Sequence, residues 1–432
     1  MRLADLFERV LGSAPGVRFS AYDGSRAGAD EASAQVTIEL RTPRGLSYLA
    51  TSPSDLGIGR AYVAGDLEVH GDMYTAMKLV SEAQFGSLPW RDRWELIKGY
   101  GPDVVKHFAR PPAQEVRLRG RRHSKQRDGE AVSHHYDISN RFYELVLGPS
   151  MTYTCAVYPH PDATLEQAQE EKYDLVCRKL GLQPGMRLLD VGCGWGGMVM
   201  HAAQHYGVQA LGATLSRQQA EWASKAIADA GLEGRAEVRF SDYRDVPEAE
   251  FDAVSSIGLT EHIGRGNLGP YFASLRAKLR PQGRLLNHCI TRPRNDQPVL
   301  KRHGFINRYV FPDGELEGAA TIGRAMQDCG LELRHEENLR EHYAMTLRDW
   351  GTNLERNWDD CVREVGVGRA RVWRVYMAGS RLSFEQGSIE LHQILGVRTE
   401  GGQAAMPLRP DWERAASELP VRHRQLGQVV TS

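Results

Sequence analysis

The chain has 432 residues, more than one typical domain contains, and this length predicts two domains. Lys and Arg number 54 against 55 Asp and Glu, so the net charge of −1 excludes a global attraction to nucleic acid or to anionic lipid. The 6 cysteines form no C-x-x-C pair, which argues against a zinc ribbon or a secreted disulfide framework and favours a reducing cytoplasm. The N-terminus lacks the apolar stretch of a signal peptide and no window approaches about 18 apolar residues, so we expect no membrane-spanning segment.

The first part of the chain, residues 1–110, is predicted to form a small α/β domain. Its alternating and helical patterns predict, in chain order, a strand at 36–42, a turn at 43–45, a return strand at 46–51, and helices near 59–68 and 72–84. We see no catalytic cluster here. We therefore expect this domain to present lipid or to mediate formation of a homodimer.

Residues 111–130 are predicted to form a basic linker, because prolines are followed by many cations and few large apolar residues. The cations are Arg117, Arg119, Arg121, Arg122, Lys125 and Arg127. Two interpretations stay open. The charges keep a solvated face soluble, or they form a patch that meets the phosphate headgroups of a membrane.

Residues 131–432 show the alternation of strands and helices that is typical of an α/β, doubly wound, mostly parallel sheet. The predicted strands are 187–192, 208–214, 236–241, 251–257 and 283–290, and the helical runs between them include 166–180 and 216–230. The chain beyond Phe311 is expected to be mostly helical. In such a sheet, ligands bind at the carboxyl ends of the strands.

The first of these strands runs directly into a glycine-rich turn, and this turn predicts a ligand site. Gly192, Gly194, Gly196 and Gly197 let backbone N–H groups approach a ligand closely. A dinucleotide site would need an acidic residue about 20 positions further on, and residues 211–216 contain none. The turn therefore fits a nucleoside-type cofactor better than NAD.

Nine segments, one of which contains this turn, occur in an order that is similar to that of a known family. They are His134–Tyr143, Met151–Cys155, Leu188–Gly197, Thr214–Gln219, Asp242–Asp245, Ser256–Gly264, Asn287–Ile290, Arg308–Gly314 and His342–Leu347. This set resembles the cyclopropane fatty acid synthase family of S-adenosylmethionine-dependent methyltransferases, with a class I Rossmann-like fold. The N-terminal domain with Phe19–Ser25, together with Ser256–His262 and Asn287–Thr291, looks more like the actinobacterial branch that makes 10-methylene fatty acids, precursors of 10-methylstearic (tuberculostearic) acid.

The resemblance implies a reaction at the cis double bond of an oleoyl phospholipid. The alkene attacks the sulfonium methyl, the methyl adds to C10, and a cation remains at C9. A cyclopropane synthase then removes a proton from the new methyl and closes the ring. In the methylene branch a hydride first shifts from C10 to C9, and proton loss from the methyl gives an exocyclic methylene, which a separate flavin-dependent reductase would saturate.

The resemblance also implies which residues hold the cofactor and the base. The implied S-adenosylmethionine residues are Tyr153, Thr154, Asp190, Gly192, Gly194, Gly196, Thr214, Ser216, Gln219, Asp242 and Tyr243. The family binds a bicarbonate ion as the base, and the corresponding residues are Glu261, His288, Tyr343, Cys155 and Ile290. No metal is implied. The expected partners are phospholipid acyl chains, reached by peripheral attachment to the inner face of the cell membrane, and no nucleic acid.

Two positions depart from the family pattern. Thr260 stands where cyclopropane synthases usually have Phe, and its smaller polar side chain either alters the lifetime of the cation or reflects neutral drift. Ser380 stands where a cysteine has sometimes been given a catalytic role, so a nucleophilic cysteine is not expected. Alternatives to the methylene product are a cyclopropane product, a non-catalytic lipid-binding protein and a methyltransferase for small soluble substrates.

Overall fold

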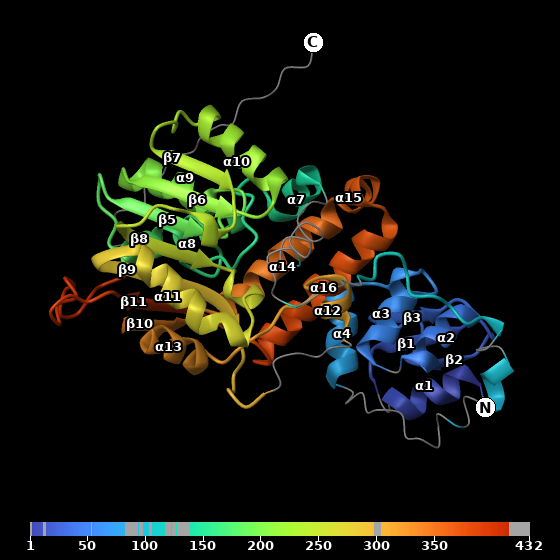
Figure 1. Cartoon of the computed structure of the whole chain (residues 1–432). Coiled ribbons are helices and arrows are strands. Elements are labelled where there is room, and N and C mark those ends of the chain that lie inside the picture. The colour runs from blue at the N-terminus through green and yellow to red at the C-terminus, as the bar shows by residue number, and fades with distance from the viewer. Residues whose placement is uncertain are drawn as a thin grey trace, which may run out of the picture.

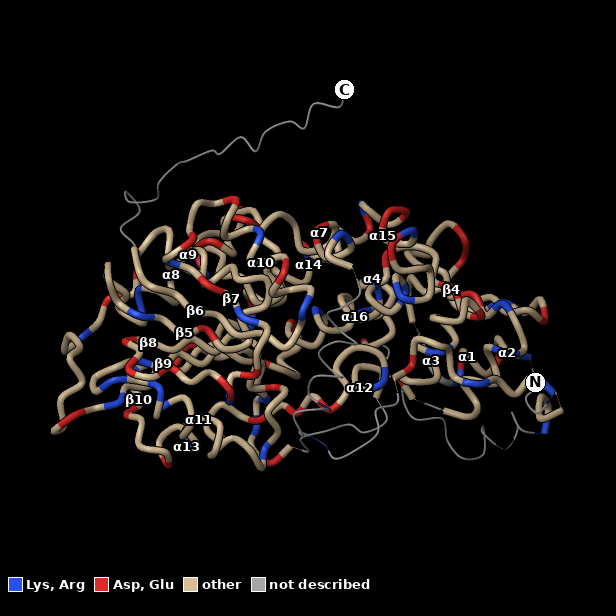
Figure 2. Tube along the Cα trace, turned by 45° about the horizontal axis from the view of Figure 1, so that its top comes forward, with Lys and Arg blue, Asp and Glu red and all other residues tan. Residues whose placement is uncertain are grey.

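A computed structural model describes residues 2–11, 14–52, 54–82, 139–297 and 304–413, together with 94, 98–102, 106–116, 122 and 127. It contains two α/β units, each built around its own sheet (Figure 1). Basic and acidic residues are interspersed over both units (Figure 2), in keeping with the balanced composition. Within the described residues, no helix has the length and apolar character needed to cross a membrane.

The N-terminal unit surrounds a sheet with the strand order β2-β1-β3-β4, in which β1 and β3 are parallel and the outer pairs are antiparallel. Its elements are α1 (Leu3–Leu11), β1 (Val17–Ala21), β2 (Arg26–Gly28), β3 (Val36–Leu40), α2 (Pro43–Thr51), α3 (Asp55–Val63), β4 (Leu67–His70) and α4 (Met73–Glu82). The predicted strand at 36–42 and the helix at 72–84 are confirmed by β3 and α4. The helix expected near 59–68 ends earlier, at Val63, and is followed by β4.

The predicted return strand at 46–51 is wrong, because these residues belong to the helix α2. The side chain of Thr42 accepts a hydrogen bond from the backbone N–H of Gly45 at 3.2 Å, and Pro43 occupies the first turn. A threonine cap followed by proline is a helix-start signal. Leu46 and Tyr48 are buried by this helix, so the apolar residues that suggested a strand face the core of the unit.

The C-terminal unit contains the longer part of the chain. Its elements are α7 (Asn140–Leu147), α8 (Leu165–Leu180), β5 (Arg187–Val191), α9 (Gly197–Tyr206), β6 (Gln209–Thr214), α10 (Arg217–Asp229), β7 (Ala236–Phe240), η1 (Tyr243–Asp245), β8 (Phe251–Ile257), η2 (Thr260–His262), η3 (Arg265–Asn267), α11 (Leu268–Lys278), β9 (Leu279–Thr291), α12 (Phe305–Tyr309), α13 (Ala319–Asp328), β10 (Glu332–Asn338), α14 (Arg340–Arg356), α15 (Trp358–Val365), α16 (Val367–Glu385) and β11 (Glu390–Val397).

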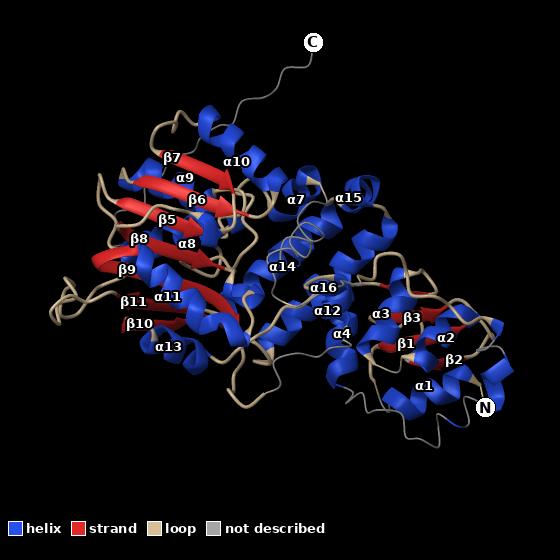
Figure 3. Cartoon of the chain, in the orientation of Figure 1, coloured by secondary structure: helices blue, strands red, loops and turns tan. Residues whose placement is uncertain are grey.

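These strands form a seven-stranded sheet with the order β10-β11-β9-β8-β5-β6-β7, parallel from β9 to β7 (Figure 3). One face packs against α8, α9 and α10 through a cluster that includes Val176, Met198 and Ala223. The other face packs against α11 and α13 through Leu275 and Met326. The predicted doubly wound class and its five strands are confirmed, with β9 starting earlier than expected, at Leu279.

Two strands in the region beyond Phe311 were not expected. The strand β11 pairs antiparallel with β9, and β10 pairs antiparallel with β11. In this register Gln393 lies opposite His288. Each of these strands pairs with a partner more than 50 residues away in sequence, so the local pattern does not reveal them.

The two units are packed together along α16, which contacts α3 and α4 (Figure 1). The guanidinium of Arg371 donates to the backbone oxygen of Tyr62 at 2.7 Å and forms an ion pair with Glu68 at 2.5 Å. Arg60 of the N-terminal unit pairs with Glu115 of the predicted linker, at 2.6 and 2.8 Å. The boundaries at 110 and 130 stay predictions, because much of the chain around them lies outside the described residues.

Candidate active site

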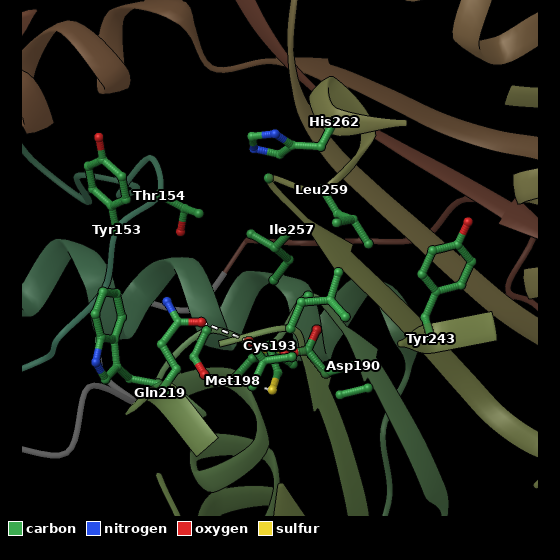
Figure 4. Close-up of a pocket in the computed structure, with 18 of the residues that line it drawn as sticks. Tyr153, Thr154, Asp190, Cys193, Met198, Gln219, Tyr243, Ile257, Leu259 and His262 are labelled. Carbon is green, nitrogen blue, oxygen red and sulfur yellow. Dashed lines mark hydrogen bonds between the residues drawn. The ribbon is translucent and has the colours of Figure 1, made fainter. Parts of the chain in front are cut away.

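A cavity opens at the carboxyl ends of β5, β6 and β8, where a doubly wound sheet binds its ligands (Figure 4). Its wall includes eight of the predicted cofactor residues. They are Tyr153, Thr154, Asp190, Gly192, Gly194, Thr214, Gln219 and Tyr243. Residues 131–138, with the first half of the His134–Tyr143 segment, lie outside the described residues.

The glycine turn between β5 and α9 has the backbone that the sequence predicts. Gly192, Gly194 and Gly196 have φ angles of 72°, 55° and 80°, a left-handed region that favours glycine. Gly196 caps α9, so the first amides of this helix follow the turn directly. Gly196 itself is not on the cavity wall, and its role is to let the chain turn into the helix.

Thr214, Ser216 and Gln219 form one hydrogen-bonded group at the end of β6. The Thr214 hydroxyl donates to Gln219 Oε1 at 2.7 Å, and Ser216 Oγ accepts from the backbone N–H of Gln219 at 3.2 Å. Ser216 is fully buried as the cap of α10 and does not reach the cavity wall. The structure therefore places Ser216 behind Gln219, as the cap of the helix that carries it, while Thr214 holds the Gln219 side chain.

Asp242 also lies behind the wall rather than on it. Its carboxylate accepts from the guanidinium of Arg244 at 2.7 and 2.5 Å and from the Arg244 backbone N–H at 2.9 Å. Arg244 lines the cavity beside Tyr243. An acid that is bound in this way orients Arg244.

The cavity wall also contains residues that the sequence did not predict, among them Lys172, His262 and Leu259. Lys172 had a usable signal. Lys172 lies on the same face of α8 as Gln169, Val176 and Lys179, and all four residues are buried. A lysine on the buried face of a helix is a candidate for function, because a charged group is rarely buried without a partner.

Glu261 lies in η2, in the turn that follows the cavity residues Gly258 and Leu259. Its Oε1 accepts a hydrogen bond from the backbone N–H of Ile290 at 2.7 Å, and its Oε2 is buried with no hydrogen-bond partner among the described residues. Burial raises the pKa of Glu261 to about 7. This carboxyl can therefore hold or release a proton near neutral pH.

His288 lies on β9 beside the same turn, since its backbone oxygen accepts from Gly258 N at 2.8 Å. Its Nδ1 is 3.2 Å from Gln393 Nε2, and its Nε2 is buried without a partner in the described part of the chain. Burial lowers the pKa of His288 well below its usual value, so the imidazole is neutral. Glu261 and His288 thus each present one unsatisfied polar atom.

Tyr343 and Cys155 come from other parts of the chain. Tyr343 is buried on α14, with its ring 4.5 Å from that of Phe384 between centroids. Cys155 is fully buried, and burial raises the pKa of its thiol, so it is no thiolate nucleophile. Its neighbour Ala156 donates to Thr346 Oγ1 on α14 at 3.0 Å, which ties this loop to the helix that carries Tyr343.

Comparison with known proteins now decides the family. The mycolic acid cyclopropane synthetase family matches residues 123–394, well over half of the chain. The chain belongs to this family. As a cyclopropane synthetase family member it is an S-adenosylmethionine-dependent methyltransferase. The cavity at the glycine turn lies at the edge of the sheet where a doubly wound fold binds its ligands.

Relatives of this cyclopropane synthetase family member cover most of its length. A Mycobacterium tuberculosis protein named "probable fatty acid methyltransferase" is 54% identical over 409 residues, which are 92% of this chain and 95% of that protein. The cyclopropane-fatty-acyl-phospholipid synthase of Escherichia coli (strain K12) is 30% identical over 380 residues, 87% of this chain and 91% of the relative. The crystal structure of a mycolic acid cyclopropane synthase complexed with SAH and CTAB gives a TM-score of 0.59 at 32% identity, covering 62% of this chain and 98% of that one.

The position that departs from the family pattern, Thr260, does not present its hydroxyl as a free polar wall. Thr260 is buried, and its Oγ1 donates to Asn287 Oδ1 at 2.6 Å. Asn287 Nδ2 in turn donates to Cys289 Sγ at 3.2 Å. These contacts join η2 to β9 next to Glu261 and His288. Ser380 is half-buried on α16.

Two cationic residues of the predicted basic linker, Arg122 and Arg127, pair with a residue of the cavity wall. These pairs engage charges that were considered for binding membrane headgroups. Arg127 donates to both carboxylate oxygens of Asp313, at 2.5 and 2.9 Å, and Arg122 lies 3.3 Å from the same carboxylate. Asp313 lines the cavity and has a φ of 69°, unusual for a residue other than glycine. Arg117, Arg119, Arg121 and Lys125 lie outside the described residues, so the headgroup interpretation stays a prediction for them.

We predict that Arg127→Met raises the KM for S-adenosylmethionine by about fivefold to fiftyfold, because the bidentate pair that fixes Asp313 is then lost. Initial rates at varied cofactor concentration measure the change. Arg141→Met is the control, since Arg141 forms an exposed pair with Glu144 at 3.0 Å and should leave the KM unchanged. A KM that is the same in both variants would contradict a role for Arg127 at the cavity.

Proposed function

We propose that this protein transfers the methyl group of S-adenosylmethionine to the cis double bond of an oleoyl phospholipid acyl chain and forms a 10-methylene product, the precursor of 10-methylstearic acid. One observation carries the proposal. The unsatisfied atoms of Glu261 and His288 are buried beside the cofactor cavity. The relatives named for fatty acid methylation and for cyclopropane synthesis on phospholipid support the substrate class.

The surroundings of this pair suit a carbocation. A buried cluster that includes residues of α14 and α16 is rich in aromatic rings. Tyr343, Trp350 and Tyr376 belong to it, and Tyr153 and Phe311 pack against it. Such rings stabilise nearby positive charge, and a dry site prevents water from quenching the cation. A base is needed only for the last proton, which leaves the transferred methyl group.

The residues fit a small polar anion as that base. A buried polar atom without a partner costs about 1–3 kcal/mol, so two such atoms favour a guest that donates to one and accepts from the other. Bicarbonate has this chemistry, and when bound it would supply the proton acceptor. Glu261 and His288 would hold it. The Ile290 amide already donates to Glu261 Oε1, so this N–H would either bind both Glu261 and the bicarbonate or leave Glu261 to bind the bicarbonate.

The deciding experiment incubates the protein with S-adenosylmethionine and oleoyl phospholipid vesicles and examines the released fatty acids by proton NMR. We expect vinylidene signals of an exocyclic methylene. Upfield ring protons would instead establish the cyclopropane alternative, and no product would favour a non-catalytic lipid-binding protein. A product formed only from soluble substrates would favour a small-molecule methyltransferase. Flotation of the protein with the same vesicles tests the peripheral membrane attachment.

Thr260 offers a test of how the product is chosen. We predict that Thr260→Val lowers turnover about tenfold and changes the ratio of methylene to cyclopropane product, because Asn287 loses a buried hydrogen bond beside His288. Thr260→Ser keeps the hydroxyl and should behave like the natural protein. Product ratios by NMR and kcat values check both variants. Identical behaviour of the Val and Ser variants would exclude a role for this hydrogen bond.

A further inference from the structure

The wall of the cofactor cavity contains a buried lysine that the proposed reaction does not use. Lys172 on α8 is 1% exposed, and its Nζ donates to Thr154 Oγ1 at 3.0 Å. The neighbouring α8 residues hold the same loop, since Gln169 Nε2 donates to the backbone oxygen of Thr154 at 2.9 Å and the Tyr173 hydroxyl lies 2.8 Å from Thr152 Oγ1. One side of α8 thus fixes the segment that forms one wall of the cavity.

Lys172 has no ion pair within 4 Å among the described residues, and few titratable groups lie near it. Besides Thr154, it faces Asp190 on β5, Cys155 in the loop, the ring of Tyr173 at 3.7 Å and, further off, His288 on β9. Burial raises the pKa values of the Cys155 thiol and the Tyr173 hydroxyl and lowers the pKa of His288, so these three groups are neutral. Asp190 is the remaining group that can carry charge.

Lys172 and Asp190 therefore give the same cavity one buried group that can be a cation and one that can be an anion. Burial lowers the pKa of Lys172 and raises the pKa of Asp190, each to about 7, so a ligand of opposite charge decides whether each group is ionised near neutral pH. The other charged side chains on the wall are matched elsewhere, since Arg244 binds Asp242 and Asp313 binds Arg127. The methionine end of the cofactor is a zwitterion, with an ammonium and a carboxylate on one carbon. A cation on the cavity wall can bind the carboxylate of the cofactor and an anion can bind its ammonium, which a wall of neutral side chains could not do as strongly.

We propose that Lys172 is a cofactor-binding residue that recognises the α-carboxylate of S-adenosylmethionine, directly or through the Thr154 hydroxyl that it holds, with Asp190 facing the α-ammonium. This assignment rests on the cofactor and not on the acyl product, so it can be tested without a lipid substrate. It also predicts proton linkage. Burial lowers the pKa of Lys172 to about 7, and a bound carboxylate would raise it again, so carboxylate binding takes up a proton near neutral pH.

The test compares S-adenosylhomocysteine with its decarboxylated analogue, S-adenosyl-3-thiopropylamine, by isothermal titration calorimetry on the full chain. We expect the natural protein to bind the carboxylated ligand more tightly, and Lys172→Met to reduce that preference at least about tenfold. Lys278→Met is the matched control, because Lys278 is a partly buried lysine that donates to Val246 O, away from the cavity wall. It should keep the preference.

A purely structural Lys172 would give another result, in which the Met variant weakens both ligands equally and the preference is unchanged. That outcome would overturn the proposal. If Lys172→Met does not fold, the natural protein decides the question through titrations in two buffers of different ionisation enthalpy. At pH 7.5 the binding of S-adenosylhomocysteine should be accompanied by more proton uptake than the binding of the analogue. This difference should vanish near pH 6, where Lys172 is already protonated in the free protein. Equal proton uptake at pH 7.5 would also overturn the proposal.

Discussion

Glu261→Gln is expected to lower kcat by about 10²–10⁴-fold while the Kd for S-adenosylmethionine changes by less than about threefold. Glutamine keeps the size of Glu261 but cannot exchange a proton with a base held beside its unsatisfied Oε2. Single-turnover rates on vesicles and calorimetric cofactor titrations separate the two effects. Parallel losses in rate and in cofactor affinity would make Glu261 a structural residue.

The stability of this variant provides the control, and its sign follows from the pKa of Glu261, which burial raises to about 7. The folded state holds this proton more tightly than the unfolded chain does, so the group stabilises the fold at low pH and loses that contribution as pH rises through about 7. Glutamine does not ionise. Glu261→Gln should therefore match the natural protein at pH 4 and exceed it by about 1–3 kcal/mol in unfolding free energy at pH 8.5. A variant that is less stable at both pH values would point to lost packing.

Trp350→Ala is expected to lower the free energy of unfolding by about 3–5 kcal/mol, the largest stability effect that we predict. Trp350 on α14 is fully buried, and its ring centroid lies 5.3 Å from that of Tyr153 and 6.1 Å from that of Tyr343. The cavity left by alanine would also release two rings of the proposed active site, so activity should fall as well. Urea denaturation followed by circular dichroism measures the change.

The matched variant is Trp350→Phe, which keeps an aromatic ring and removes the indole N–H. That N–H has no hydrogen-bond partner among the described residues, so its loss should cost little, and we expect less than about 1.5 kcal/mol. Losses of equal size in the Phe and Ala variants would show that the N–H, and not the ring volume, stabilises this cluster.

The sequence predicted the frame of the site because that frame rests on local patterns. Apolar strands alternate with helices at the spacing of a doubly wound sheet, and Gly192, Gly194 and Gly196 mark a turn that only a positive φ permits. The strand predicted at residues 46–51 is wrong because an apolar run fits a helix or a strand equally well, and the Thr42 cap decides for the helix.

The tertiary structure alone decided how distant residues combine. The edge strands β10 and β11 exist through pairing, and β11 brings Gln393 to His288 across 105 positions. The Ile290 amide meets Glu261 through a contact that has no periodic signature. The helical spacing of Lys172 predicts that this residue is buried, but only the folded chain shows that it lies on the cavity wall and donates to Thr154. Composition and periodicity report which face of an element is buried, and this determined the fold class and the glycine turn. Which buried polar groups are left unsatisfied depends on every neighbour at once, so only the folded chain shows it.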